Sequence, residues 1–249
     1  IPDMSGDPYW DKVDLYVPFN GTDGSTSATD LSTYANTLTA AGNAHISTAQ
    51  SKFGGSSAIF DGSGDYFSVA NNEVGDFYSY GGGTFECWIY PTSLATQFII
   101  FQTYTDTGSS NGFIFHIGTD GKVILYAREY LVINAAAGAV VTNAWQHIAL
   151  GITAGGAAGI YVDGNLKGSG TFSSSAGYNN ADRTYIGGNI YGASATGYIS
   201  HVRRTRGIVR YTSDFTPPSA AFDTFGATLL STAIQRPLVQ AFNPLIFHY

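Results

Sequence analysis

Charged residues are scarce in this sequence, and most of them are acidic. Of the 249 residues, 12% are charged, about half the share of about 25% that is usual for a soluble domain. There are 11 Lys and Arg against 18 Asp and Glu, so the formal net charge is −7. A negative chain repels polyanions at long range. We therefore expect no nucleic-acid partner.

Cysteine and long hydrophobic runs are also almost absent. Cys87 is the only cysteine, so no intrachain disulfide and no thiolate metal cluster can form. The longest nearly unbroken apolar stretch, residues 131–141, contains Asn134 and is far shorter than the roughly 18 residues of a membrane-spanning helix. We expect no membrane partner. Because the chain opens with Ile1 rather than with a methionine, we expect a processed form or a fragment.

The residues that are abundant exclude disorder and coiled coil. The chain is 44% hydrophobic and holds 31 Gly, 17 Tyr and 16 Phe. A disordered chain combines low hydrophobicity with high charge, and a coiled coil is rich in Ala, Glu, Lys and Leu. Aromatic residues together with many glycines favour strands joined by tight turns. Since all-β sandwiches of about 200–250 residues fold as one unit, we expect one domain.

Short apolar or alternating runs recur along the chain, each bounded by Gly, Ser, Asn or Asp. They predict strands at residues 15–19, 57–60, 66–69, 85–90, 98–102, 113–117, 123–127, 145–152, 159–162, 184–186 and 198–202. No segment shows sustained 3.6-residue periodicity, so the pattern indicates an all-β antiparallel sandwich or jelly roll. Asp163-Gly164 and Asp120-Gly121 lie between apolar flanks, which is the strongest short-range signal of a β-hairpin.

Residues that could catalyse glycoside hydrolysis or lysis are not suitably placed. A retaining glycosidase needs two carboxyl groups about 5–5.5 Å apart, yet Glu73, Glu86 and Glu129, the only glutamates, are widely separated. An alginate-lyase type of site would use Gln146 and His147 together, but neighbours on a strand point to opposite faces. The five histidines form no H-x-H or H-x-x-x-H pair that would indicate zinc. We expect no enzyme.

Calcium is the one metal that the sequence leaves open. Asp61 and Asp65 flank a Gly-Ser-Gly turn, and Ca²⁺ takes about six to eight oxygen ligands from such carboxylates and turn carbonyls. The alternative is a glycine-rich hairpin in which both Asp side chains bond to nearby backbone. The turn is favoured because the further acids of an EF-hand loop are absent. We expect no required cofactor, with calcium as the alternative to test.

Three polar segments, residues 106–112, 173–182 and 192–197, are expected as exposed loops at the ends of the sandwich. An aromatic ring beside small polar donors can stack on a sugar. The candidate carbohydrate-binding residues in or next to these loops are Tyr104, Tyr178, Tyr191 and Asn111. Alternatively, the rings anchor their loops by burying one face and leaving the hydroxyl in water. Both interpretations stay open.

Four of the seven arginines lie within eight residues of this acidic chain: Arg203, Arg204, Arg206 and Arg210. One interpretation is a patch for an acidic partner surface or for anionic sugars, since Arg binds carboxylates bidentately. Arg206 and Arg210 are then the candidate partner-binding residues. The other interpretation is a strand with Arg203 paired internally and the other three in water.

The C-terminal segment 227–249 is apolar and holds a single formal charge, Arg236. Its large side chains, among them Leu238, Phe242 and Phe247, would be exposed unless covered, and monomers rarely expose so much apolar surface. The segment either folds over its own sandwich as an edge strand or docks on another subunit as an arm. Its prolines favour the arm, so these three residues are candidate partner contacts.

A series of short motifs runs through the chain in a fixed order. They are KFGGSSA (52–58), FDGSGDY (60–66), FECWIYP (85–91), WQHIA (145–149), IYVDG (160–164), YIGG (185–188), GYI (197–199), VR (202–203) and YTSDFTPP (211–218). This series resembles the laminin G-like, concanavalin A-like jelly rolls over roughly residues 13–222. The resemblance implies a sandwich of two packed antiparallel sheets.

The ends of the series narrow the resemblance. The opening DLYVPFNG (14–21) and the closing R-Y-T-x-x-F-x-P-P (210–218) resemble copies found in tailed-phage structural proteins. That implies a part of a virion surface: a tail fibre, a head fibre or a capsid decoration. One departure is Ser200-His201, where related copies carry an acidic pair. We therefore expect no cation or salt bridge that depends on that pair.

Together these observations predict an organisation and a function. We expect a polar N-terminal segment at 1–12, a laminin G-like β-sandwich at 13–224 and an apolar arm at 225–249, which contacts copies of the chain or other virion proteins. The predicted function is a non-catalytic structural protein of a virion surface with weak glycan recognition through its loops. The alternative is an extracellular carbohydrate-binding or adhesion module of a secreted bacterial protein. A polysaccharide-active enzyme ranks third.

Overall fold

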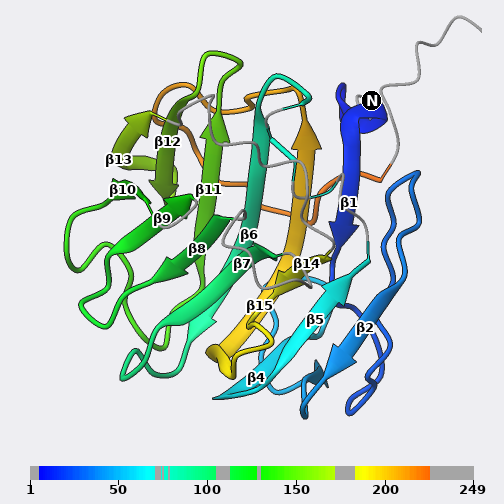
Figure 1. Cartoon of the computed structure of the whole chain (residues 1–249). Coiled ribbons are helices and arrows are strands. Elements are labelled where there is room, and N and C mark those ends of the chain that lie inside the picture. Colours follow the sequence, from blue (N-terminus) through cyan, green and yellow to red (C-terminus); the bar gives the residue numbers. More distant parts are fainter. Residues whose placement is uncertain are drawn as a thin grey trace, which may run out of the picture.

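The protein folds into two antiparallel β-sheets that pack face to face (Figure 1). The computed structural model describes residues 6–70, 74, 76–77, 79–104, 113–127, 130–171 and 183–224. Besides strands, these residues form one short 3-10 turn, η1 (Trp10–Lys12). They contain no helix long and apolar enough to be a candidate membrane span. The predicted all-β jelly roll is confirmed.

One sheet has eight strands. They are β1 (Val13–Val17), β3 (His45–Ser47), β4 (Ser57–Ser63), β6 (Gly83–Pro91), β11 (Gln146–Ile152), β12 (Ala157–Val162), β13 (Asn165–Thr171) and β15 (Ala193–Arg206). The order is β13-β12-β11-β6-β15-β4-β3, and β1 pairs with β15. Strand β15 pairs with β6 on one side; on the other side its first half pairs with β4 and its second half with β1. The long strand β15 therefore lies at the centre of this sheet.

The other sheet has seven strands. They are β2 (Leu38–Ala41), β5 (Tyr66–Val69), β7 (Phe98–Tyr104), β8 (Phe113–Ile117), β9 (Val123–Ala127), β10 (Tyr130–Asn134) and β14 (Arg183–Ile186). The hydrogen-bonded order is β10-β9-β8-β7-β14-β5-β2. Consecutive strands β7 to β10 form a meander, whereas β14 is inserted between β7 and β5 from a distant part of the chain.

One hydrophobic core lies between the two sheets. Alternate residues of each strand point into it, so Phe85 in β6 meets Phe101 in β7, with ring centroids 4.3 Å apart. Phe113 and Phe115 of β8 join the same cluster. Burying each such side chain contributes about 1.5–3 kcal/mol. The core of the described residues is therefore built largely from the phenylalanines that the composition shows to be abundant.

Each predicted strand is present, and the strands at 66–69, 113–117 and 123–127 have the predicted bounds. The sequence pattern does not predict β2, β3, β10 or β13. Strand β13 is made mostly of Gly, Ser and Lys, without an apolar alternation. It forms because it pairs with β12 and packs on β10, where a Cβ on Gly170 would lie 2.1 Å from the carbonyl oxygen of Val132. Glycine here permits a close approach that no local pattern encodes.

Both predicted hairpins are present. Asp163 and Gly164 join β12 to β13 with φ of 48° and 78°, as a type I′ turn requires. The hairpin at Asp120-Gly121 joins β8 to β9 through a longer loop. There only Gly121 has a positive φ, of 74°, and the Gly118 N–H donates to the Lys122 carbonyl (2.8 Å).

After β15 the chain returns across the outer face of the eight-stranded sheet. We call residues 207–222 the strap; it is the orange segment of Figure 1. Its contacts include the Arg210 N–H to Thr84 Oγ1 (2.8 Å), the Phe215 N–H to the Gly164 carbonyl (2.9 Å) and the Phe222 ring to the Tyr16 ring (5.6 Å between centroids). The predicted arm, 225–249, lies outside the described residues, and with it Leu238, Phe242 and Phe247.

The described part of the N-terminal segment also packs on the sandwich. Trp10 is 8% exposed, and its ring lies edge-on to Tyr16 at 6.2 Å. Asp7 is 6% exposed. In a segment that the sequence predicts as polar, Asp7 and Trp10 are therefore buried, whereas Pro8, Tyr9, Asp11 and Lys12 are exposed.

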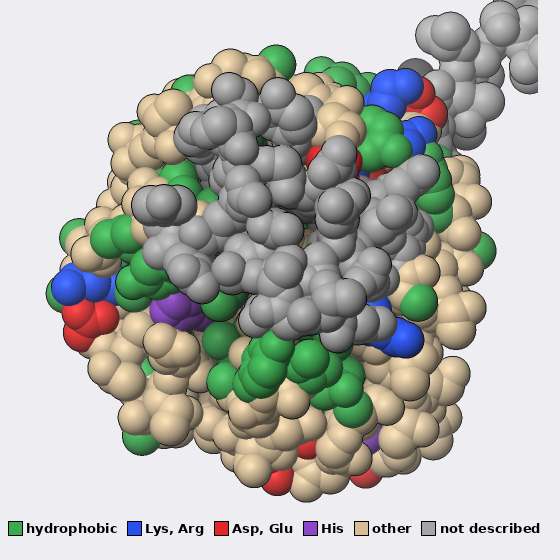
Figure 2. Space-filling model, in the orientation of Figure 1, with side chains coloured by type: hydrophobic (Ala, Val, Ile, Leu, Met, Phe, Trp, Pro, Cys, Tyr) green, Lys and Arg blue, Asp and Glu red, His purple; other side chains and the backbone are tan. Residues whose placement is uncertain are grey.

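The scarcity of charge is visible on the surface. On the face shown in Figure 2, Lys, Arg, Asp and Glu side chains lie in small separate groups, mostly near the edge. Uncharged side chains predominate among the rest of the coloured atoms. This face therefore carries no basic patch among the described residues of the kind that binds nucleic acid.

Candidate functional site

Glu86 is a fully buried acidic residue on the outer face of the eight-stranded sheet. Its neighbours in β6, Phe85 and Cys87, point into the core, so Glu86 points the other way, under the strap. Its exposed fraction is 0%. Burying an unpaired carboxylate costs several kcal/mol, so the fold has to supply partners.

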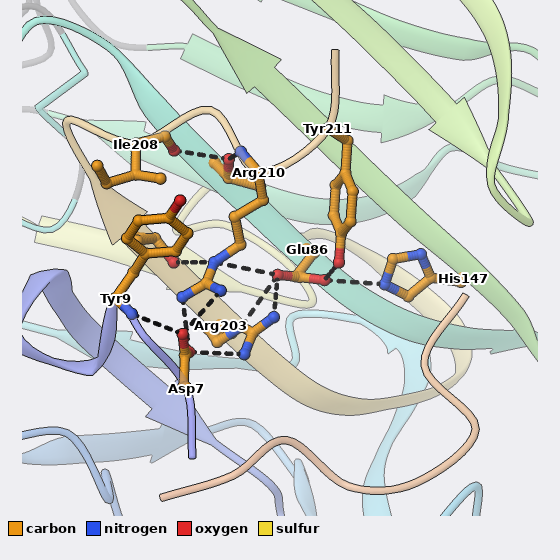
Figure 3. A network of polar contacts seen from close by, with 10 residues as sticks. Asp7, Tyr9, Glu86, His147, Arg203, Ile208, Arg210 and Tyr211 are labelled. Carbon is orange, nitrogen blue, oxygen red and sulfur yellow. Dashed lines mark hydrogen bonds and ion pairs between the residues drawn. The ribbon is translucent and has the colours of Figure 1, made fainter. Parts of the chain in front are cut away.

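Three side chains from distant parts of the chain form hydrogen bonds with the Glu86 carboxylate, and Arg210 Nε lies 3.9 Å from its Oε1 (Figure 3). Arg203 of β15 donates from Nε (2.9 Å) and Nη2 (2.6 Å) to Oε1. Tyr211 of the strap donates its hydroxyl to Oε2 (2.8 Å), and His147 of β11 donates from Nε2 to the same oxygen (3.1 Å). Both carboxylate oxygens therefore have partners.

Asp7 extends this network to the N-terminal segment. Its carboxylate accepts from Arg203 Nη1 (3.0 Å) and from both terminal nitrogens of Arg210 (3.0 and 2.6 Å). The Tyr9 N–H also donates to it (2.9 Å). Two arginines thus share two carboxylates between them. We call Asp7, Glu86, His147, Arg203, Arg210 and Tyr211 the clasp, because it joins the N-terminal segment, three strands and the strap.

The electrostatics of the clasp are those of a structural site. Burial alone would raise the pKa of Glu86, but the Arg203 charge, the hydrogen bond and charge of His147 and the Arg210 charge outweigh it and hold that pKa well below its usual range. Burial, and then the Glu86 charge, raise the pKa of the Tyr211 hydroxyl. A catalytic general acid needs a pKa close to the working pH. Glu86 instead stays ionised and bound to its partners.

A second buried ion pair lies beside the clasp, between Asp14 of β1 and Arg204 of β15. Both side chains are 0% exposed. Arg204 Nη1 donates to the Asp14 carboxylate, and Nη2 donates to the Asp76 carbonyl. Burial raises the pKa of Asp14 to about 6, although the Arg204 charge opposes this shift. Within the described residues, one oxygen of Asp14 and Nε of Arg204 have no hydrogen-bond partner.

The four clustered arginines therefore do not share one role. The internal pairing expected for Arg203 is present, but Arg204, expected in water, is fully buried. Arg210, a predicted partner contact, is bound to Asp7 inside the molecule. Arg206 remains half-exposed, with its guanidinium 4.9 Å from the Tyr34 ring centroid and 5.0 Å from that of Tyr80. Both predicted contacts are partly exposed, but the Arg210 side chain is only 10% exposed and is paired with Asp7.

The candidate calcium residues form a hydrogen-bonded turn. Each Asp65 oxygen accepts a backbone N–H, from Asn43 (2.7 Å) and from Asp61 (2.8 Å). The Asp61 oxygens accept from the Ser63 N–H (2.9 Å) and the Asn43 side-chain amide (2.8 Å). Donors therefore occupy all four carboxylate oxygens, an arrangement that favours the turn interpretation. Calcium binding itself stays a prediction.

Two of the four predicted loop residues, Tyr104 and Tyr191, belong to the described part of the chain. Tyr191 is 60% exposed, in the loop that precedes β15. Tyr104 is the last residue of β7 and pairs with Arg183 through the backbone, but its side chain is outside the description. Tyr178 and Asn111 lie outside the described residues. Tyr191 is thus the one candidate whose surroundings are known.

The described residues hold no group of three or more His, Cys, Asp or Glu that could bind a metal ion. The histidines are instead separate: burial lowers the pKa of His116 and of His201 to about 4, and His147 belongs to the clasp. Cys87 is buried in the core. Its neighbour Trp88 is 4% exposed and lies on the outer face beneath Lys52, whose ammonium is 3.8 Å from the Trp88 ring centroid.

Two antiparallel sheets packed around one core define a β-sandwich of the jelly-roll class. Residues 61–205 match the family model described as the concanavalin A-like lectin/glucanases superfamily. The match spans more than half of the chain, and the chain belongs to this superfamily. No curated protein sequence matches the chain significantly.

Several solved structures have a similar fold. One is domain 4 of AbnA, a GH43 extracellular arabinanase from Geobacillus stearothermophilus in complex with arabinotriose; the TM-score is 0.59 at 20% identity, over 80% of this chain and 94% of that one. The receptor binding domain of botulinum neurotoxin C/D mosaic serotype has a TM-score of 0.59 at 13% identity, over 83% of this chain. This chain spans about half of that structure, 49%. At these identities the likeness concerns the fold.

Proposed function

We propose that this protein is a non-catalytic carbohydrate-recognition domain displayed on the surface of a phage-like particle. The proposal that the protein is not a catalyst rests on the burial and pairing of the Glu86 carboxylate. Its carboxylate is fully buried, binds Arg203, Tyr211 and His147, and is held ionised. A glycosidase needs a second carboxyl group nearby and an acid that can release its proton. The other acid of the clasp, Asp7, is bound to two arginines.

The carbohydrate part is supported by the superfamily and by what related folds bind. The arabinanase domain was solved with arabinotriose, and the similar structure of botulinum neurotoxin type C was described with cell entry that depends on two ganglioside molecules. This chain shares their fold, and its surface is largely uncharged.

The particle setting is the finer part of the proposal. Its support is the pair of terminal motifs, 14–21 and 210–218, which resemble those of tailed-phage structural proteins, and the apolar segment 227–249, which suits attachment to a neighbour. The chain would then be a capsid decoration or a fibre component at the virion surface. The alternative, favoured by the sugar-binding relatives, is an extracellular adhesion module of a secreted bacterial protein.

Two measurements test the proposal. Incubation with a panel of neutral oligosaccharides should give binding without any shortened product in chromatography; release of shorter sugars would overturn the non-catalytic assignment. Mass spectrometry of purified particles from the source should find this chain at a fixed ratio to capsid or tail proteins. Recovery from the cell surface or the medium without such proteins would favour the adhesion module.

A further inference from the structure

A strip of aromatic side chains crosses the outer face of the eight-stranded sheet, beside the clasp. Tyr90 of β6 and Tyr198 of β15 are register partners, and Trp145 immediately precedes β11. Ring centroids are 5.6 Å apart for Trp145 and Tyr90, and 6.0 Å apart for Tyr90 and Tyr198. All three side chains are partly exposed. Three neighbouring strands therefore present a continuous aromatic surface.

The register fixes the direction of these side chains. Ile89 and Ile199, the neighbours of Tyr90 and Tyr198, are fully buried core residues. Because successive strand residues point to opposite faces, both tyrosines point away from the core. The strap covers the part of this face around Glu86, four residues before Tyr90. The aromatic strip is thus the part of the face that the strap leaves accessible.

The strip continues across two more strands. Ile59 of β4 is the register partner of Tyr198, and His45 of β3 is the partner of Ile59. Both are partly exposed. We call Trp145, Tyr90, Tyr198, Ile59 and His45 the outer-face row. It contains no Lys, Arg, Asp or Glu.

Polar groups border the row on both sides. Thr196 precedes Tyr198 by two residues on β15 and is the register partner of Asp61, and the Thr92 hydroxyl donates to the Thr196 carbonyl (3.2 Å). On the other side, the Lys52 ammonium lies 3.8 Å above the Trp88 ring. Hydroxyl, carboxylate and ammonium groups can all exchange hydrogen bonds with sugar hydroxyls. An apolar strip with a few polar groups at its rim is the usual composition of a small-molecule site.

We propose that the outer-face row is a binding site for a soluble, neutral oligosaccharide, with Trp145, Tyr90 and Tyr198 as the stacking residues. This inference rests on the proposed carbohydrate recognition and names its site. Sugar rings present C–H faces that pack on aromatic rings, and the ring-to-ring steps of 5.6 and 6.0 Å match a chain of consecutive sugar units. The absence of charge in the row matches a neutral ligand.

The tilt between the rings indicates what kind of chain fits. The Trp145 and Tyr90 planes are inclined at 56°, and the Tyr90 and Tyr198 planes at 75°. A flat crystalline polysaccharide would need coplanar rings. Rings that turn from one to the next suit a single flexible chain whose sugar units also turn along its length.

The size of the row argues against a protein partner. A large aromatic side chain has about 150–250 Å² of surface, so three that are only partly exposed together offer at most about 300 Å². A stable protein interface buries about 800 Å² on each partner. The row is therefore too small for a dimer or a capsid contact, whereas it suits a ligand of a few sugar units.

Titration of the full chain with neutral arabino-, xylo-, cello-, manno- and malto-oligosaccharides tests the site. For the best ligand, Tyr90→Ala and Tyr198→Ala should each lower affinity about tenfold, the usual loss at a contact of high energy, while Tyr198→Phe keeps the ring and the affinity. Two control variants are Tyr126→Ala, a half-exposed aromatic of the other sheet, and Tyr191→Ala, the predicted loop residue. Both should bind as the wild type does.

Fluorescence supplies a second measurement. Of the three tryptophans, Trp10 and Trp88 are 8% and 4% exposed, whereas Trp145 is partly exposed. A ligand-induced change in emission should therefore disappear in Trp145→Phe.

The possible outcomes separate the two proposals. If the wild type binds and Tyr90→Ala and Tyr198→Ala bind equally well, the outer-face row is wrong while carbohydrate recognition stands. Loss of binding in Tyr191→Ala alone would place the site at the loop. If the wild type binds no member of the panel, both proposals are overturned.

Discussion

At the scale of single residues, the clasp shows that several of the few charged side chains of this acidic chain pair with one another inside the fold. Glu86 and Asp7 hold Arg203 and Arg210 in a buried network whose formal charges balance. Asp14 and Arg204 form a second buried pair. Charges that the composition makes rare are thus concentrated at the junction of the chain's two end segments with the sandwich.

Neutralising Glu86 should destabilise the fold strongly. Glu86→Gln keeps the size of the side chain but leaves two buried guanidinium groups with a single carboxylate. We expect the free energy of unfolding, measured by chemical denaturation, to fall by about 3–5 kcal/mol. Asp120→Asn is the matched control, because it removes a surface pair with Lys122 whose side chains are 48% and 32% exposed, for which about 1 kcal/mol or less is expected. Equal losses in the two variants would contradict a structural clasp.

The same residue should make stability depend on acid. The pKa of Glu86 in the folded protein lies well below its ordinary value of 4.5, so its ionised form stabilises the fold fully above about pH 4.5, and this contribution is lost as the pH falls through lower values. The stability difference between the wild type and Glu86→Gln should therefore be smaller at pH 3 than at pH 6. A stability difference of the same size at both pH values would show that folding does not lower the pKa of Glu86.

Calcium should have no effect if Asp61 and Asp65 serve the turn. All four of their carboxylate oxygens accept N–H donors, and a bound Ca²⁺ would need oxygen ligands in place of these donors. We expect the midpoint of thermal unfolding to stay constant during titration to millimolar calcium, with magnesium as the control ion. A rise with calcium alone would establish a calcium site.

At the scale of elements, the strap connects regions that are far apart in the sequence. It runs from β15 to the turn between β12 and β13, where the Phe215 N–H donates to Gly164, and it ends on Tyr16 of β1. The type I′ turn at Asp163-Gly164 thus has two functions: it closes a hairpin and it holds the strap.

Gly164→Ala should separate these two functions. Gly164 has a φ of +78°, and a Cβ there would lie 1.8 Å from the Phe215 carbonyl oxygen. Gly24 has a φ of +77° with nothing within 4 Å of its Cβ position, so Gly24→Ala measures the conformational penalty alone, about 1–2 kcal/mol. We expect Gly164→Ala to lower the free energy of unfolding by about 1–3 kcal/mol more than Gly24→Ala does. We also expect a protease to cut the strap of Gly164→Ala faster than that of the wild type during limited proteolysis. Equal losses of unfolding free energy in the two variants would mean that the strap moves away from the added Cβ without destabilising the fold.

At the scale of the whole molecule, the described residues form a closed unit that supports its own fold. One core lies between two complete sheets, and the clasp ties the N-terminal segment and the strap to it. Attachment to a neighbour is the role proposed for the segment 227–249. In the proposed function, the sandwich is the carrier, and the outer-face row and the loops are its contact surfaces.

Deleting residues 227–249 tests that division. We expect the free energy of unfolding to stay within about 0.5 kcal/mol of the full chain and association with copies of the chain or with particle proteins to be lost, measured by size-exclusion chromatography and co-purification. Loss of cooperative unfolding would show instead that this segment belongs to the fold of its own subunit.

The sequence alone determined what depends on near neighbours: an all-β fold, most strands, the hairpins at Asp163-Gly164 and Asp120-Gly121, and the lack of a paired glutamate. These follow from side-chain period and turn chemistry, which act over a few residues. Tertiary structure alone decided the clasp, in which Asp7 meets Arg203 across 196 positions, and the row formed by Trp145, Tyr90 and Tyr198. Strand order and register bring such residues together, and no local pattern records which distant strands will be neighbours.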